Sequence, residues 1–157
     1  MTGVMFGDTI KDGFGFVFRD HKATFLGAFS QNGGYATPLE AEFCACMKAI
    51  EKALDLNFTS LVLEFDSLGV IKALKNSEGV PWKMAARWHN CKQILSQFIG
   101  SFSHVPKDGN MVVDALAKNG QALAMHSSQW WPSPPLFLSQ LLYRDSLDLS
   151  FSRIYID

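Results

Sequence analysis

The feature that most constrains the fold of this chain is a change in the spacing of its apolar residues. Between residues 14 and 18, phenylalanine occupies every second position, which is the period of a β-strand. Between residues 43 and 54, apolar side chains recur after three or four positions and form one stripe of a helix. A chain with both periods buries both apolar surfaces when helices cover a β-sheet. We therefore expect a mixed α/β fold.

The same patterns predict the order of the elements. An opening hairpin favours an antiparallel edge of the sheet, and strands that alternate with helices in the second half favour a parallel portion. We expect strand, strand, helix, strand, helix, helix, strand and helix, in that order. The expected strands are residues 14–19, 24–30, 60–65 and 99–105, and the expected helices are residues 38–55, 68–76, 82–98 and a last one after residue 110.

Length and composition predict one domain with a C-terminal addition. A chain of 157 residues is long enough for a core that needs no disulfide or metal. After residue 125 the sequence becomes rich in turn residues and contains a Trp-Trp pair followed by prolines. We therefore divide the chain into a domain at residues 1–125 and a linker with a C-terminal appendage at residues 126–157.

Charge and cysteine content restrict the partners and the compartment. The net charge of −1 and the isoelectric point of about 6.4 mean that a nucleic-acid partner has to meet a local basic patch. Cys44, Cys46 and Cys91 are typical of buried thiols in a reducing compartment. No apolar run reaches the ~18 residues of a membrane span. We expect an intracellular monomer with no membrane partner.

Three acidic residues stand where an α/β sheet commonly holds ligands. Glu42 lies in the first turns of the first expected helix, and Asp66 directly follows a strand. Asp114 lies near the start of the last helix, and His104 ends the strand before it. Each of these residues alone has an ordinary explanation as a helix cap or a solvated side chain. Together they offer the oxygen ligands that Mg²⁺ prefers.

Four stretches around these residues carry a family resemblance. They are GFVFRDH at 15–21, EAEF at 40–43, LEFDS at 63–67 and SHVPKDGNMVVDALA at 103–117. They resemble the plant ribonuclease H-like domains that are related to non-LTR retrotransposons. The resemblance extends over about residues 2–125. It implies a ribonuclease H-like mixed five-stranded sheet flanked by helices, and Mg²⁺-dependent endonuclease cleavage of the RNA strand of an RNA–DNA hybrid.

The resemblance also implies roles for single residues. Glu42, Asp66 and Asp114 match three of the four acidic ligands that hold two Mg²⁺ ions in the family. His104 matches a histidine thought to help product release or proton transfer. Asn110 matches a residue of the same motif, where it contacts nucleic acid or fixes the loop before the last helix.

Two basic residues on the expected third helix are further candidates for contact with nucleic acid. Lys83 and Arg87 lie close in sequence to Trp82 and Trp88. The two tryptophans could stack on nucleotides, but tryptophans on helices more often pack against a sheet.

The sequence departs from the family at its first strand. Counting back from Arg19 places Thr2 where the family has an Asp followed by Gly. A hydroxyl carries no charge to offset the repulsion between two dications. The nearby acid, Asp8, is expected in the loop before the second strand. The first strand, which is central in the family, is expected to be truncated to residues 3–6.

These observations leave three functions open. A longer natural form of the protein could supply the missing Asp and make a working ribonuclease. The chain could instead be a nucleic-acid-binding module that does not cleave, or a decayed copy of a retroelement. For this chain by itself we expect weak or absent cleavage.

Overall fold

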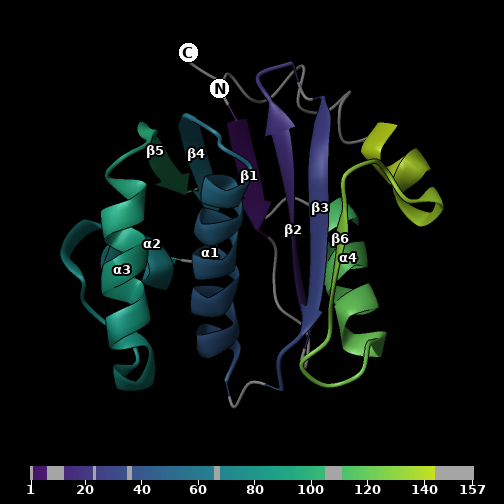
Figure 1. Cartoon of the computed structure of the whole chain (residues 1–157). Coiled ribbons are helices and arrows are strands. Elements are labelled where there is room, and N and C mark those ends of the chain that lie inside the picture. The colour runs from purple at the N-terminus through teal and green to yellow at the C-terminus, as the bar shows by residue number, and fades with distance from the viewer. Residues whose placement is uncertain are drawn as a thin grey trace.

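The computed structural model describes residues 2–6, 13–22, 24–34, 37–65, 68–104 and 111–143. For residues 2–6, 65, 68 and 100–104 the description is limited to the backbone. Six strands of the described residues form one sheet, with helices on both of its faces (Figure 1). The strands are β1 (Thr2–Phe6), β2 (Gly13–Asp20), β3 (Phe25–Asn32), β4 (Ser60–Phe65), β5 (Ile99–His104) and β6 (Ser128–Trp131). The helices are α1 (Pro38–Asp55), α2 (Leu68–Asn76), α3 (Ala85–Leu95) and α4 (Met111–Ala122), with 3₁₀ turns η1 (Trp82–Met84) and η2 (Leu136–Leu138).

The sheet is mixed, as the sequence predicts. Its strand order is β5-β4-β1-β2-β3-β6. β1 pairs antiparallel with β2 and parallel with β4, and β4 pairs parallel with β5. The short β1 therefore occupies the centre of the sheet and bonds on both sides. The central position and the truncation expected for the first strand are both confirmed.

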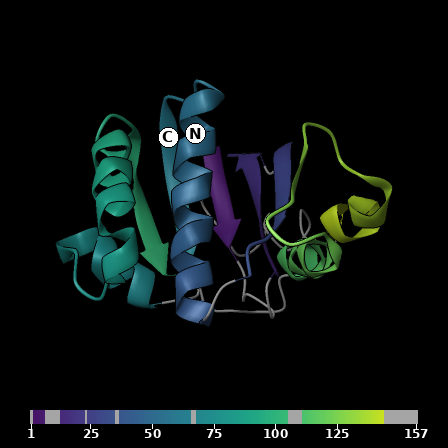
Figure 2. The ribbon, with the colours of Figure 1, turned by 60° about the horizontal axis from the view of Figure 1, so that its bottom comes forward.

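The alternation of side chains along β2 divides the core between the two faces of the sheet. Phe14, Phe16 and Phe18 are buried on the face covered by α1, α2 and α3. Val17 points to the other face, where it packs in a second cluster with Val112 and Leu116 of α4. Figure 2 shows α4 with the C-terminal helical turn beside it, away from α1. The period of two seen in the sequence thus marks the phenylalanines of one face, while the apolar Val17 between them buries the other face as well.

The first helix begins where the sequence predicts. The Oγ1 of Thr37 accepts a hydrogen bond from the backbone N–H of Glu40 at 3.2 Å. Pro38 follows at the first helical position, where its missing N–H costs nothing. The apolar stripe of α1 then packs on the sheet and on α3, where Phe43 meets the ring of Trp88 edge-on at 4.9 Å.

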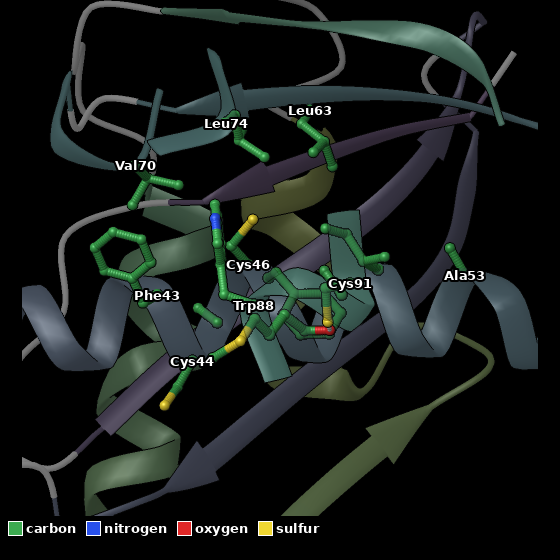
Figure 3. Packing of buried hydrophobic residues seen from close by; sticks show 14 of the residues in the cluster. Phe43, Cys44, Cys46, Ala53, Leu63, Val70, Leu74, Trp88 and Cys91 are labelled. Atoms are coloured by element: carbon green, nitrogen blue, oxygen red, sulfur yellow. Dashed lines mark hydrogen bonds between the residues drawn. The ribbon is translucent and has the colours of Figure 1, made fainter. Parts of the chain in front are cut away.

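The three cysteines belong to this larger core. Cys44, Cys46 and Cys91 are free and buried, as expected. Figure 3 shows Cys44, Cys46 and Cys91 in the same cluster as Phe43 and Trp88. Burial raises the pKa of the Cys46 thiol well above its ordinary value. These thiols act as small apolar side chains.

The structure differs from the expected elements at two places. The expected helix at residues 82–98 is a 3₁₀ turn, η1, followed by the shorter α3. In addition, Ser128–Trp131, which the sequence predicts as part of a linker, pairs antiparallel with β3 as β6. The sheet therefore has six strands where five were expected.

Within the described ranges, none of the helices combines the length and the apolar character that crossing a bilayer requires.

Candidate active site

The parallel strands of the sheet end at one edge, and the predicted site residues belong to elements that begin or end there. β1, β4 and β5 run in one direction, so their last residues point to the same edge. β3 runs in that direction as well, because both β1 and β3 are antiparallel to β2. We call this side of the sheet the carboxyl-end edge.

Three helices begin after strands that end at this edge. α1 follows β3, α2 follows β4, and α4 follows β5. The amino ends of helices carry unpaired N–H groups and a partial positive charge, so they favour anions. The arrangement therefore suits a ligand that carries phosphate groups.

Glu42 and Asp114 belong to helices that cover opposite faces of the sheet. Glu42 is half-buried in the second turn of α1, which contacts β1 and β2. Asp114 is half-buried in the first turn of α4, which contacts β2 from the other side. Their carboxylates offer the oxygen donors that hard divalent ions take.

The position of α4, and with it Asp114, is fixed by close contacts with β2 and β3. The buried Oγ of Ser30 donates a hydrogen bond to the carbonyl of Leu116 at 2.7 Å. The side-chain amide of Asn32 donates to the carbonyl oxygens of Gln121 at 3.3 Å and Leu123 at 2.9 Å. A Cβ atom at Gly15 would lie 2.4 Å from the Cβ of Leu116, so glycine is required for this approach.

The backbone register brings His104 close to the predicted position of Asp66. His104 is the last residue of β5, and its Cα is the partner of the Cα of Phe65, the last residue of β4. Neighbouring strands lie about 4.8 Å apart. Asp66 directly follows Phe65 in the sequence and, like Asn110, lies outside the described residues. The catalytic and metal-binding roles of Glu42, Asp66, Asp114 and His104 stay predictions.

The register of β1 disagrees with the position inferred for Thr2. Thr2 pairs with Leu61 near the start of β4, whereas Met5 pairs with Glu64 near its end. Leu61 and Phe65 are separated by about 13 Å along an extended strand. Thr2 therefore lies at the amino end of β1, far from the end of β4. The residues of β1 that lie near Phe65 are Met5 and the residue after it. The number of residues before Arg19 therefore does not identify the residue of β1 that lies beside the end of β4. The pairing of β1 with β4 determines that residue.

The two basic candidates differ in their surroundings. The guanidinium of Arg87 donates two hydrogen bonds to the carboxylate of Glu51 on α1, at 2.6 Å and 3.1 Å. These bonds raise the pKa of Arg87 and hold its charge at the interface of α1 and α3. Lys83 is exposed on η1. Trp88 is buried, as the sequence predicts, but Trp82 is 82% exposed.

Two charged residues of the described chain are buried, which the sequence patterns did not predict. Arg19 on β2 and Glu64 on β4 are 2% and 7% exposed. They flank the central strand, since Arg19 pairs with Gly3 and Glu64 with Met5. Charged side chains are seldom buried unless they are compensated. The signal in the sequence was a charged residue within each strand, directly after Phe18 in β2 and directly after Leu63 in β4.

The described residues contain no group of three or more His, Cys, Asp or Glu side chains that could hold a metal ion. Of the three predicted ligands, Glu42 and Asp114 are among the described residues.

Solved structures with a similar fold include ribonucleases H. The chain is similar to ribonuclease H1 from the halophilic archaeon Halobacterium salinarum, with 24% identity and a TM-score of 0.67, covering 76% of this chain and 96% of that one. It is similar to LC11 ribonuclease H1 in complex with an RNA/DNA hybrid, with 18% identity and a TM-score of 0.67, covering 79% of this chain and 100% of that one. At these identities the likeness defines the class by its fold, which is ribonuclease H-like.

A viral polyprotein contains the same fold as a part of its length. The foamy viral protease-reverse transcriptase in complex with an RNA/DNA hybrid is 21% identical, with a TM-score of 0.60. The match covers 77% of this chain and 20% of that one. A search of curated protein sequences finds no match.

The family follows from the sequence itself. The profile of the reverse transcriptase-like family matches residues 3–120, more than half of the chain. The chain belongs to the reverse transcriptase-like family.

Proposed function

We propose that this chain binds RNA–DNA hybrids at the carboxyl-end edge and cleaves their RNA strand weakly with divalent metal ions. The observation that carries the proposal is the convergence of strand ends and helix starts at one edge of a ribonuclease H-like sheet. Two of the similar solved structures contain an RNA/DNA hybrid, which supports the choice of partner.

The proposed ligands of the metal ions are Glu42, Asp66 and Asp114. Carboxylate oxygens of this kind fit Mg²⁺, which prefers hard oxygen donors. Bound ions would supply an activated water and offset the negative charge of the leaving oxygen. His104, whose backbone lies beside that of Phe65, is proposed to assist proton transfer or product release. The cleavage is weak because three carboxylates offset less of the repulsion between two dications than four.

The first experiment measures binding and cleavage separately. A labelled RNA–DNA hybrid is incubated with the chain and Mg²⁺, and with the variants Asp66→Asn and Glu42→Gln. We expect slow cleavage that both variants abolish, because each removes a charged ligand. Asp55→Asn, at the other end of α1, is the matched control and should leave the rate unchanged.

The outcomes separate the proposal from its alternative. Binding without cleavage in any Mg²⁺ concentration would favour a non-catalytic nucleic-acid-binding module. Failure to bind the hybrid would overturn the proposal as a whole.

The second experiment tests the register of β1. Thr2→Asp adds a carboxylate at the amino end of β1, so we expect it to leave cleavage unchanged. Asp8 lies two residues after Phe6, the last residue of β1. Asp8→Asn abolishes the remaining activity if Asp8 supplies the fourth carboxylate. Strong activation by Thr2→Asp would show that the residue count, and not the strand pairing, locates the missing ligand.

A further inference from the structure

Trp82 is a large aromatic side chain that the core does not use. It lies at the start of η1 and is 82% exposed, whereas Trp88, six residues later, is 2% exposed. Tryptophan is highly buried on average, because its large ring gains much from leaving water. The exposed indole of Trp82 therefore offers a flat apolar surface to a ligand.

The segment around Trp82 concentrates positive charge in a chain that is slightly acidic. Residues 68–98 contain five basic residues and one acidic residue, a net charge of +4, while the chain as a whole has −1. The remainder of the chain therefore has a net charge of −5. The basic residues are Lys72, Lys75, Lys83, Arg87 and Lys92, and the acidic residue is Glu78.

We call Trp82, Lys72, Lys75 and Lys83 the α2–η1 surface. The three lysines are exposed, whereas Arg87 is held by Glu51. The connection between α2 and η1 is itself tied to α3, because the ammonium of Lys92 donates to the hydroxyl of Ser77 at 3.0 Å.

In the sequence, the lysines of α2 follow closely after Asp66, a predicted residue of the candidate active site. α2 starts at Leu68, two residues after Asp66, and Lys72 and Lys75 follow in its next turns. A helical turn advances about 5.4 Å. Figures 1 and 2 both show α2 and α3 together at the side of the molecule next to β5, away from α4.

We propose that the α2–η1 surface binds a single-stranded continuation of the nucleic acid held at the carboxyl-end edge. This inference rests on the proposed function. The lysines contact the phosphates, and the indole of Trp82 stacks on an unpaired base. The partner is a single strand because the faces of paired bases are covered by their neighbours in a duplex. An unpaired base exposes its face to an aromatic ring, and such stacking strengthens binding about tenfold or more per base.

The test compares two hybrids that differ in one feature. One hybrid is blunt-ended, and the other carries a single-stranded RNA extension of about eight nucleotides, within the usual range of single-strand sites. Affinity is measured by fluorescence anisotropy without Mg²⁺, so that cleavage does not interfere. We expect the chain to bind the extended hybrid about tenfold more tightly than the blunt one.

Variants test whether the α2–η1 surface causes the tighter binding of the extended hybrid. Trp82→Ala should abolish the advantage of the extended hybrid and leave blunt-ended binding unchanged, while Trp82→Phe should retain part of it. Lys72→Glu and Lys83→Glu should reduce the advantage and its dependence on salt, since each removes a phosphate contact. Tyr143→Ala, which removes an aromatic side chain 67% exposed elsewhere, and Lys118→Glu on α4 are the controls and should change neither affinity.

The results keep this inference apart from the proposed function. Equal binding of both hybrids by the unmodified chain would overturn the inference and leave the proposed function standing. The inference is also overturned if Trp82→Ala lowers the affinity for both hybrids by the same factor. If neither hybrid binds, the proposed function fails, and the inference fails with it.

Discussion

At the scale of single residues, the buried thiol of Cys91 shows how position controls chemistry. Its Sγ lies 3.8 Å from the carbonyl oxygen of Met47 and 3.9 Å from the carboxylate of Glu51. Burial, followed by the negative charge of Glu51, raises the pKa of Cys91 from 9.0 to about 12. The folded chain therefore keeps this thiol protonated at a pH where the unfolded chain has lost the proton.

This pKa shift predicts a loss of stability in alkali. Below pH 9.0 the thiol is protonated in both states, so the protonated form contributes its full stabilisation. Between pH 9.0 and about 12 the unfolded state loses the proton first, so the free energy of unfolding falls as pH rises. Urea denaturation at pH 8 and pH 10 measures the change, and Cys91→Ala should reduce it. An equal loss in both proteins would show that another group is responsible.

At the scale of elements, β6 is held to the sheet by an aromatic side chain above a glycine. Trp130 of β6 packs edge-on against Phe18 at 6.0 Å, and the ammonium of Lys52 lies 4.4 Å from its ring centroid. A Cβ at Gly27 of β3 would lie 2.1 Å from the Cη2 atom of Trp130. The contact therefore requires a residue without a side chain at position 27.

Gly27→Ala should displace Trp130 and destabilise the fold. Overpacking of this kind costs about 1–3 kcal/mol. Trp130→Ala removes the obstacle, so the double variant should lose less stability than the two single losses combined. Thermal denaturation of the four proteins gives this double-mutant cycle. If the losses of stability of the two single variants add up to that of the double variant, Gly27 and Trp130 do not interact.

The elements that the sequence predicted well are those with a local signal. α1 has a capping Thr, a Pro at the first position and a long apolar stripe, and it begins and ends where expected. β6 lacked such a signal, because Trp130 and Trp131 are adjacent and prolines follow at once. The two rings face opposite sides of the sheet and join different clusters, as neighbouring residues on a strand do. The formation of β6 therefore depends on its partner strand β3, which lies about a hundred residues earlier in the chain.

The site was predicted less completely, for a related reason. The sequence placed Glu42 and Asp114 at the starts of helices and His104 at a strand end, as observed. It misplaced Thr2, because residue counting assumes a loop of constant length between β1 and β2. Pairing with β4 fixes β1 independently of that loop.

At the scale of the whole molecule, the C-terminal residues join the two cores of the sheet. Trp130 packs against the larger cluster, while Trp131 packs against the cluster of α4 and contacts Phe137 at 5.7 Å. Leu138, in η2, is fully buried in that second cluster. Residues 128–138 thus complete the core on both faces, although they lie beyond the stretch that matches the family.

A chain that ends at residue 125 should accordingly be less stable than the full chain. It loses the pairing partner of β3 and the buried area of Trp130, Trp131 and Leu138, which amounts to several kcal/mol at about 1.5–3 kcal/mol for each large apolar side chain. Thermal unfolding of the two chains under identical conditions measures the loss. Equal melting temperatures would show that residues 1–125 form an independent domain.

The central place of β1 has a consequence for how the protein is made. This strand is synthesised before the other strands of the sheet, yet its pairing partner β4 follows some sixty residues later. The hairpin of β2 and β3 is available much sooner. Contacts between distant parts of a chain slow folding, since the intervening loop has to close before they form. A nascent chain therefore holds its middle strand with one side unpaired until β4 emerges, and in that interval it is most exposed to wrong partners.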